Sequence, residues 1–357
     1  MLPQLRRTAL WPVELLVSVD RHRERRDDTA LMMRVSIGLL LLTSIVAPGC
    51  NRSASKAGAY TIAVIPKGTT HEFWKSIHAG AVKAERELND QGLKVSVVWK
   101  GPLREDDREQ QVQVVEGFLS QNVSGIVLAP LDNLALVRPV EEAKRANIPT
   151  VIIDSGLNSS EIVSFVATDN LKGGMVAAER IGALLEGKGK VLLLRYQEGS
   201  ASTHDREEGF LQKLKSAYPG TEVISSDQYA GPTRDTAFRA SQNLLNRYGN
   251  DIQAVFTPNE SATAGMLLAL QDINKAGKIK HVGFDATAPL LDALRSRQLE
   301  GLVIQDPFKM GYLGVTTMVD YLQKKPVEQR VDTGVYLITP DNLDDPQFKT
   351  LLHPPTE

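Results

Sequence analysis

From residue 60 onward, short apolar runs alternate with longer stretches in which apolar residues recur every three or four positions. Short runs rich in Val, Ile and Leu are typical of buried strands, whereas the longer periodic stretches predict amphipathic helices. In the first half of the chain the apolar runs are 61–66 (TIAVIP), 94–99 (KVSVVW), 125–130 (GIVLAP) and 150–154 (TVIID). The helical patterns that lie between them cover residues 71–88, 105–120 and 134–146.

The same alternation restarts in the second half of the chain. Apolar runs lie at 190–194, 221–226, 253–256, 281–284 and 301–305, and helical patterns at 205–216, 234–246, 261–275 and 289–296. Unbroken apolar strands that alternate with helices predict a parallel sheet covered on both faces. The predicted fold class is therefore α/β, with two doubly wound parallel-sheet lobes. Ligands are expected at the carboxyl ends of their strands.

An export signal is predicted before the first strand. Residues 33–50 (MRVSIGLLLLTSIVAPGC) combine one Arg, an apolar run too short to span a bilayer, and the only cysteine of the chain, Cys50. The small residue directly before Cys50 predicts a lipoprotein signal that is cleaved there, so that a lipid is attached to this cysteine. Ala47 and Pro48 depart from the usual lipoprotein pattern. An ordinary secretory signal followed by an incidental cysteine is therefore the alternative.

Either signal predicts a periplasmic or cell-surface protein. Residues 1–31 mix both charge signs and match no targeting segment, which favours Met32 or Met33 as the start of translation. We interpret residues 1–49 as an upstream extension and lipoprotein signal, and the small, polar residues 50–59 as a flexible tether.

Composition and motifs argue against several function classes. The 41 Lys and Arg residues against 43 Asp and Glu give a formal net charge of −2, so nothing in the charge points to nucleic acid. Phosphate-binding, nucleophile-elbow and zinc-protease motifs are absent, and the six histidines are scattered. The acidic pairs at 106–107 and 207–208 are interpreted as solvated helix starts. We therefore expect no enzyme, no metal site and no cofactor.

Polar and aromatic side chains gather where the predicted strands end. Lys67, His71, Phe73 and Trp74 follow the first strand, and further polar residues end or follow later strands, namely Asp154, Asn259, Glu260, Asp285 and Gln305. Carboxyl ends of parallel strands meet at one edge of a sheet, so these side chains are candidates for one ligand site. Each has an ordinary alternative: Trp74 fits the core stripe of its helix, and Asp or Asn after a strand is often a helix cap.

These pieces resemble the periplasmic sugar-binding proteins of the ribose-binding type, which feed ABC transporters. The resemblance runs from Tyr60 to about Val335 and rests on TIAVIPKGTTHEFW, IVLAPLD, IPTVIIDS, VATDN, DREEGF, FTPNE, VGFD and VIQDP, in the order of that family. It implies a type I periplasmic binding protein with a three-crossing hinge near Thr168, Gln305 and Thr333. Lobe 1 would comprise residues 60–167 and 306–333, and lobe 2 residues 168–305 and 334–350.

The resemblance also implies a ligand site. The matching positions are Lys67, His71, Phe73, Trp74, Asp154, Ser155, Arg206, Pro232, Asn259, Asp285 and Gln305. Aromatic rings would cover the apolar face of a sugar, and Asp, Arg, Asn and Gln would bind its hydroxyls. Three positions depart from the ribose-type pattern: Lys67 replaces a small polar residue, Ser155 an Arg, and Pro232 a stacking aromatic. Because Lys is a point charge and not a planar fork, the ligand stays open between a neutral sugar, an acidic or modified sugar and another small polar solute.

The sequence thus predicts an exported receptor, monomeric and anchored to the membrane by lipid, that binds a monosaccharide or similar solute between two lobes and delivers it to an ABC-type permease. A sensor for a membrane kinase or chemoreceptor is the first alternative, because it would use the same body. A lac-repressor-type regulator shares the fold but needs a helix-turn-helix before the first strand, where this chain has an apolar export segment. A hydrolase would need a nucleophile with its base and acid, and none is apparent.

Overall fold

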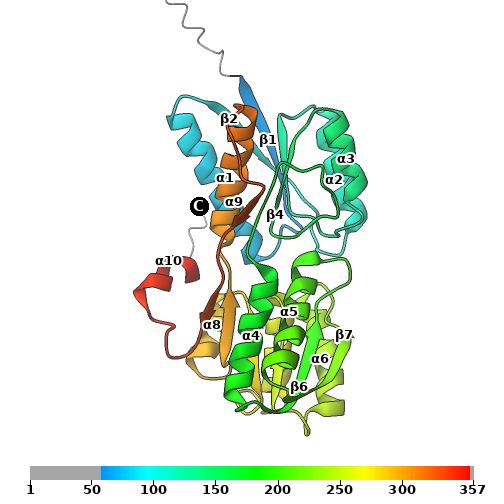
Figure 1. Cartoon of the computed structure of the whole chain (residues 1–357), viewed down its shortest axis with the longest axis vertical. Helices are drawn as coiled ribbons and strands as arrows, with labels where there is room; N and C mark the ends of the chain where they lie inside the picture. Colours follow the sequence, from blue (N-terminus) through cyan, green and yellow to red (C-terminus); the bar gives the residue numbers. More distant parts are fainter. Residues whose placement is uncertain (1–57, 354–357) are drawn as a thin grey trace, which may run out of the picture. The chain divides into compact units, whose positions relative to one another are not determined.

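The computed structural model describes residues 58–353, which form two six-stranded sheets flanked by helices (Figure 1). The first sheet has the order β11-β5-β4-β3-β1-β2, and all its paired strands are parallel. Its strands are β1 (Ala59–Ile65), β2 (Lys94–Trp99), β3 (Gly125–Leu128), β4 (Thr150–Ile153), β5 (Ser164–Ala167) and β11 (Arg330–Asp332). Its helices are α1 (Glu72–Asp90), α2 (Arg108–Ser120), α3 (Val137–Arg145) and α9 (Pro307–Leu322).

The second sheet has the order β12-β10-β9-β8-β6-β7. Its strands are β6 (Lys188–Arg195), β7 (Gly220–Tyr229), β8 (Ala254–Phe256), β9 (Lys280–Phe284), β10 (Gly301–Ile304) and β12 (Tyr336–Ile338). Its helices are α4 (Asn170–Leu184), α5 (Ala201–Ala217), α6 (Arg234–Tyr248), α7 (Glu260–Asp272), α8 (Ala288–Arg295) and α10 (Lys349–Leu352), the last preceded by a 3-10 turn, η1 (Pro346–Phe348). The predicted α/β class with two doubly wound sheets is confirmed, with one departure: β12 pairs antiparallel with β10. We refer to the two sheets with their helices as lobe 1 and lobe 2.

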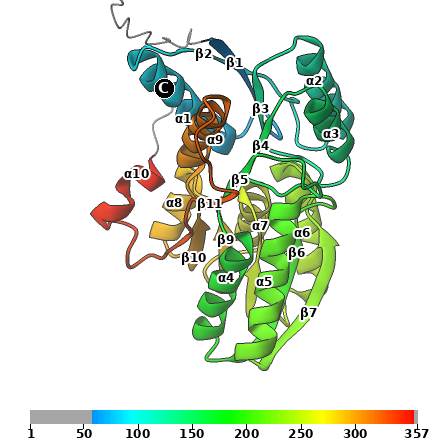
Figure 2. The ribbon, with the colours of Figure 1, turned by 45° about the horizontal axis from the view of Figure 1, so that its top comes forward.

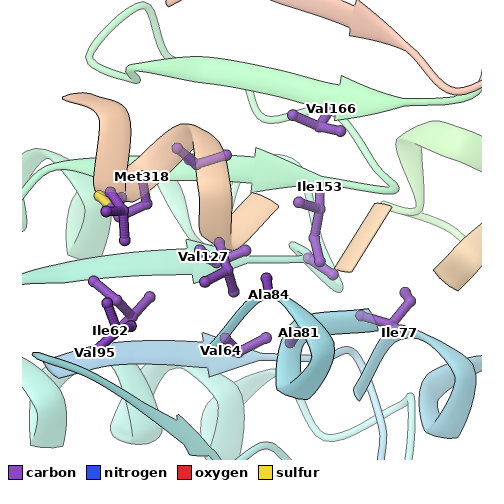
Figure 3. Close-up of a cluster of buried hydrophobic side chains, with 14 of the residues drawn as sticks. Ile62, Val64, Ile77, Ala81, Ala84, Val95, Val127, Ile153, Val166 and Met318 are labelled. Carbon is purple, nitrogen blue, oxygen red and sulfur yellow. The ribbon is translucent and has the colours of Figure 1, made fainter. Parts of the chain in front are cut away.

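The central strands β3, β4, β8 and β10 are buried at every position because they are almost entirely apolar, whereas the edge strands β2 and β7 also carry polar, exposed residues. In lobe 1, α1 and α9 cover one face through a cluster that includes Ile62, Val64, Ile77 and Met318 (Figure 3). Helices α2 and α3 cover the other face through the alternate strand residues, such as Ala63 and Ile65. In lobe 2, α4 and α5 cover one face and α6, α7 and α8 the other.

The chain passes three times between the sheets. It leaves the first sheet between β5 and α4, returns between β10 and α9, and leaves again between β11 and β12. The Thr168 hydroxyl donates to the carbonyl of Gly334, and Arg330 Nη2 donates to the carbonyl of Thr168 at 2.9 Å. Two of the three connecting segments are therefore bonded to each other, and both run from the first sheet to the second, following the parallel strands β5 and β11 (Figure 2).

Several elements differ from the sequence prediction. The predicted tether through residue 59 overlaps β1, where Ala59 already pairs with Lys94. Helices α4 and α9 were not predicted because their glycines weaken the helical pattern. Strands β5, β11 and β12 were also not predicted; β11 has a single apolar residue between two charged ones. The predicted export signal, Cys50 and residues 50–57 lie outside the described residues.

Glycines hold α1 and α9 in direct backbone contact. A Cβ atom built on Gly80 would lie 2.0 Å from the carbonyl oxygen of Phe308, and one on Gly311 would lie 1.9 Å from that of Ile77. No side chain fits at either position, since these distances are far below van der Waals contact. The α1–α9 contact therefore fixes the helix that begins directly after the first strand.

We expect Gly311→Ala to lower the stability of the protein by ~1–3 kcal/mol, because the added methyl forces two helix backbones apart. Gly117→Ala in α2 is the matched control: a Cβ there meets nothing within 4 Å, so replacing a helical glycine should leave stability unchanged or raise it by up to ~1 kcal/mol. Thermal unfolding followed by circular dichroism measures both. Equal melting temperatures for the two variants would show that the α1–α9 contact is not as tight as described.

Candidate functional site

One small cavity between the two lobes is lined by nine of the ten residues predicted to bind ligand. Its volume is about 40 Å³. The predicted residues that line it are Lys67, His71, Phe73, Trp74, Asp154, Arg206, Asn259, Asp285 and Gln305. Glu105, Tyr196, Ser202, Thr203 and Glu260 complete the wall. We call this space the inner pocket.

Two matching positions lie elsewhere. Ser155 is fully buried beneath the pocket, where its Oγ accepts a hydrogen bond from the backbone N–H of Ser202 at 3.0 Å. Pro232 is not among the residues that line the pocket. Ser155 therefore joins lobe 1 to the start of α5, and the aromatic ring that lobe 2 contributes to the pocket wall is that of Tyr196.

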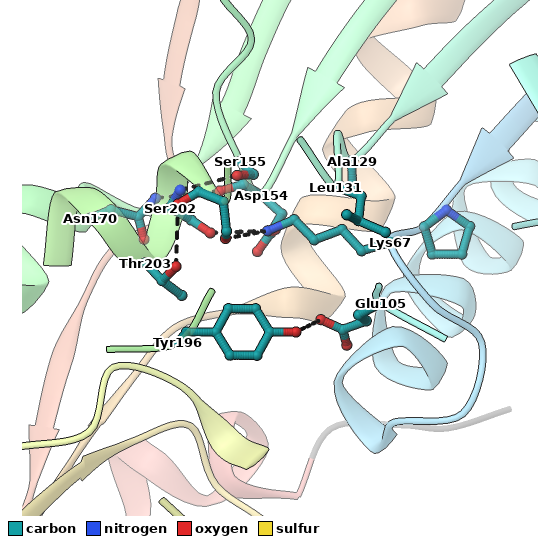
Figure 4. A network of polar contacts seen from close by, with 12 residues as sticks. Lys67, Glu105, Ala129, Leu131, Asp154, Ser155, Asn170, Tyr196, Ser202 and Thr203 are labelled. Carbon is teal, nitrogen blue, oxygen red and sulfur yellow. Dashed lines mark hydrogen bonds and ion pairs between the residues drawn. The ribbon is translucent and has the colours of Figure 1, made fainter. Parts of the chain in front are cut away.

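Lys67 and Asp154 form a buried ion pair on the lobe 1 side. Their Nζ and Oδ2 atoms are 2.9 Å apart, and each side chain is 4% exposed. Lys67 Nζ also donates to the hydroxyls of Ser202 at 3.1 Å and Ser200 at 3.5 Å, both from lobe 2 (Figure 4). A buried ammonium needs such partners because its desolvation is costly. Lys67 thus bridges the two lobes inside the pocket.

Glu105 receives three polar groups and was not predicted as a site residue. It lies between β2 and α2 and is 8% exposed. Its carboxylate accepts from Trp74 Nε1 at 2.7 Å and from the Tyr196 hydroxyl of lobe 2 at 2.8 Å, and His71 Nδ1 lies 3.2 Å away. Burial, and then the charge of Glu105, hold the pKa of Tyr196 well above its ordinary value. The phenol therefore stays protonated and donates across the cleft (Figure 4).

The guanidinium of Arg206 is the centre of the lobe 2 side. It is 2% exposed and donates to Asn170 Oδ1 at 2.8 Å, to the carbonyl of Pro258 at 2.9 Å and to Gln305 Oε1 at 3.1 Å. Its planar face lies 3.8 Å from the ring centroid of Phe284. Burial lowers the pKa of Arg206 from its ordinary value. The guanidinium of Arg206 therefore connects α4, the loop before α7 and the crossing after β10.

Asp285 sits directly after β9 with a raised pKa. Its carboxylate accepts from Gln305 Nε2 at 2.8 Å and from the backbone N–H of Glu260 at 3.2 Å. Burial raises the pKa of this carboxyl to about 6, although the nearby charge of Arg206 opposes the rise. The ionised form of this buried carboxyl would be stabilised by any further hydrogen-bond donor that reaches it.

Asp154 and Asp285 share a backbone conformation that non-glycine residues seldom adopt. Their φ angles are +63° and +67°, in the left-handed region, and each directly follows a central parallel strand. Asp tolerates this region better than most residues, at a cost of about 1 kcal/mol. The turn directs each carboxylate into the cleft, whereas a helix cap would direct it along the helix. Asn259, in contrast, does cap α7, since its side chain accepts from the N–H of Ala262.

The structure decides three further sequence interpretations, those of Trp74, Asp107 and Glu207. Trp74 meets both descriptions given for it, because it is 3% exposed in the lobe 1 core while its Nε1 atom faces the pocket. Asp107 caps α2 as expected of a helix start. The interpretation of Glu207 as solvated was wrong: it lies within α5, is 3% exposed and is bonded to Arg195 at 2.7 Å. Burial raises the pKa of Glu207.

Two kinds of feature are absent from residues 58–353. No group of three or more His, Cys, Asp or Glu side chains in this range could hold a metal ion. None of the helices formed by these residues is both long enough and apolar enough to cross a membrane.

Comparisons with known proteins agree with this fold. Residues 62–326 match the model of the periplasmic binding protein domain family. The ribose import binding protein of Bacillus subtilis is 29% identical over 317 residues, which is 87% of this chain and 98% of that protein. The D-allose-binding periplasmic protein of Escherichia coli is 30% identical over 295 residues, or 80% of this chain and 88% of that protein.

Solved structures give the same result. A carbohydrate transporter solute-binding protein from Agrobacterium radiobacter, in complex with D-arabinose, superposes with a TM-score of 0.77 at 34% identity, over 83% of this chain and 99% of that one. An ABC transporter solute-binding protein from Agrobacterium vitis with bound D-fucose has a TM-score of 0.78 at 32% identity, over 82% of this chain and all of that one. This chain therefore belongs to the periplasmic binding protein domain family, among its ribose-type sugar-binding members.

Proposed function

We propose that this protein is an exported receptor that closes its two lobes on a monosaccharide or similar small polar solute and delivers it, as a monomer, to an ABC-type permease. The observation that carries this proposal is the inner pocket, where charged and amide groups from both lobes meet beside Phe73 and Trp74. The two rings are in edge contact, with centroids 5.0 Å apart. Such a mixture suits a molecule that has an apolar ring face and many hydroxyls. The relatives bind ribose, allose and arabinose according to their names.

The balance of charge favours a neutral ligand over an acidic sugar. Four carboxylates line the inner pocket: Glu105, Asp154, Glu260 and Asp285. Each faces a basic group. Lys67 pairs with Asp154, the charge of Arg206 acts on Asp285, His71 lies beside Glu105, and Arg234 Nη2 is 2.5 Å from Glu260 Oε1. Among the described lining residues no cation is left over for an anionic ligand. A uronate or sugar phosphate would bring an unpaired charge into a buried site, which is costly.

Contacts across the cleft indicate how the lobes close. The segment after β6 reaches lobe 1 at several points: Tyr196 donates to Glu105, the carbonyl of Glu198 accepts from Arg108 Nη2 at 2.8 Å, and the carbonyl of Gly199 accepts from the N–H of Asn133 at 2.9 Å. These bonds form only when the lobes are together. A ligand that touches both lobes adds contacts that the open form cannot make, so it shifts the population toward the closed form. We assign the hinge to the crossings at Thr168, Gln305 and Thr333.

The ligand-free site carries an energetic cost at Asp285. Because its folded-state pKa of about 6 is above the unfolded value of about 3.9, the carboxyl favours folding when protonated. Its contribution is present below pH ~4 and is lost as the pH rises through about 6. A sugar hydroxyl that donates to the ionised carboxylate would offset this cost in the bound state.

We expect Asp285→Asn to stabilise the ligand-free protein at pH 7 by ~1–3 kcal/mol, with the difference vanishing near pH 4, because Asn mimics the protonated carboxyl. Urea unfolding of both proteins between pH 4 and 8 measures the effect. Asp292→Asn on α8, where the side chain is 79% exposed, serves as the control and should show no such trend. A variant less stable than the parent at pH 7 would mean that Asp285 is not held at a raised pKa.

We expect at least one neutral pentose, hexose or polyol to stabilise the protein, by ~2.7 kcal/mol at a hundredfold excess over its dissociation constant. Uronic acids and sugar phosphates should have no effect. Asp285→Ala should weaken binding of the same sugar at least tenfold, since charge-assisted hydrogen bonds contribute ~1.5–3 kcal/mol each. Thermal shift across the panel, followed by calorimetry on the hits, makes both measurements, and Asp292→Ala should bind as the parent does.

Two outcomes would contradict the proposed function. One is stabilisation by amino acids or inorganic anions with none by any neutral sugar or polyol. The other is an unchanged small-angle scattering profile at saturating ligand, because closure about the hinge must reduce the radius of gyration.

We also propose that the protein is held at the membrane through a lipid on Cys50. The order of Arg34, the apolar run and Cys50 supports this proposal. We expect the protein expressed in a bacterium with its signal to fractionate with membranes, and Cys50→Ser to shift it to soluble or unprocessed forms. Membrane fractionation with immunoblotting tests this expectation. If both proteins partition in the same way, the proposed lipid anchor is wrong, whereas the proposed receptor function is unaffected.

A further inference from the structure

A second and much larger cavity adjoins the inner pocket. Its volume is about 910 Å³, and we call it the outer chamber. His71, Phe73, Glu260, Asp285 and Gln305 line both spaces, so the two share a boundary. Ligand pockets usually have volumes of about 300–1,000 Å³, whereas a single water needs roughly 10–15 Å³. In this closed arrangement the inner pocket has room for only a few waters, so a sugar ring in it requires the lobes to lie further apart, whereas the outer chamber already has room for a further chemical group.

The walls of the outer chamber come from six parts of the chain, two of which are the start of α6, with Thr233, Arg234 and Asp235, and the start of α7, with Glu260. The start of α1 contributes Thr70 and Ser76, the loop before α8 contributes Thr287, and the crossing contributes Ile304 and Pro307. The C-terminal segment contributes Leu351, Leu352 and His353. Leu352 packs in the same apolar cluster as α8, which fixes α10 against lobe 2 beside this chamber (Figure 1). Part of the wall consists of apolar faces with hydroxyls between them, and charged side chains complete it, namely Glu72, Arg234, Asp235, Glu260 and Asp285.

Two of those hydroxyls are buried without any hydrogen-bond partner. Ser76 is 2% exposed, and its Oγ bonds nothing, although a helical Ser usually returns its hydroxyl to the preceding turn. Thr287 is the N-cap residue of α8, yet its side chain makes no cap hydrogen bond, and its Oγ1 is also unpartnered. Buried hydroxyls without a partner are uncommon and costly. Here one comes from each lobe, and both residues line the same chamber.

We propose that the cleft binds an elongated neutral carbohydrate, such as a glycoside or disaccharide, with one ring in the inner pocket and the next unit in the outer chamber. The second unit lies against Phe73, Pro289 and Leu352, and its hydroxyls are partners for Ser76 and Thr287. This inference rests on the proposed sugar-binding function and extends its ligand class. The shared boundary at His71 and Glu260 is the point through which the glycosidic link passes.

The test compares each binding monosaccharide with its own methyl glycosides and with disaccharides that carry it as a terminal ring, by isothermal titration calorimetry. We expect at least one glycoside or disaccharide to bind tenfold or more tightly than the free monosaccharide. If no extended ligand binds at least tenfold more tightly than its parent sugar, the chamber does not take a second unit and the inference is wrong. If no sugar of either length binds, the proposed function fails first.

Variants separate the chamber from the pocket. Ala288 is exposed at the start of α8 and lines only the chamber, so Ala288→Trp should lower the affinity for the extended ligand at least tenfold and leave that for the monosaccharide within twofold. Ala146→Trp, at the exposed C-cap of α3, is the matched control and should change neither. Thr287→Val keeps the shape and removes an unpartnered hydroxyl; it should weaken only the extended ligand without lowering the melting temperature. Equal losses for both ligands in Ala288→Trp would overturn the chamber assignment.

Discussion

The buried guanidinium of Arg206 needs hydrogen-bond partners for its donors, and this need determines how the surrounding cleft is arranged. A charge with 2% exposure is tolerable only when its donors are satisfied, and here an amide, a carbonyl and a second amide satisfy them from three separate segments. Gln305, held by this fork, donates in turn to Asp285. The crossing after β10 and the carboxylate of lobe 2 are therefore positioned by one buried cation. A sugar that enters must add to this network without breaking it.

The regular part of the molecule follows from local pattern. Apolar runs such as those of β1, β4 and β9 can be buried only between two layers of helices, and their carboxyl ends then bring Lys67, Asp154 and Asp285 to one cleft. Sequence alone could predict this because a strand end is a local signal. The left-handed conformation of the two aspartates was not predicted, although Asp directly after a strand is compatible with it.

The remainder depends on contacts between distant segments. Helices α4 and α9 have glycines that weaken any helical pattern, but α9 needs Gly311 because α1 passes too close for a side chain. Glu105 resembled an ordinary acidic residue near a helix start, and its role emerges only when Trp74 and Tyr196 converge on it. No spacing along the chain indicates that meeting, since residues 105 and 196 belong to different lobes.

The close contact between α1 and α9 has a consequence for how such receptors diversify. Helix α1 follows His71 and contains Phe73 and Trp74, while α9 begins two residues after Gln305. A substitution at Gly80 or Gly311 would tilt α1 and displace its aromatic rings without altering any residue that touches a ligand. In this lineage, substitutions at the α1–α9 interface can therefore change ligand preference, just as substitutions in the cleft can. A comparison of relatives restricted to pocket residues would miss that route.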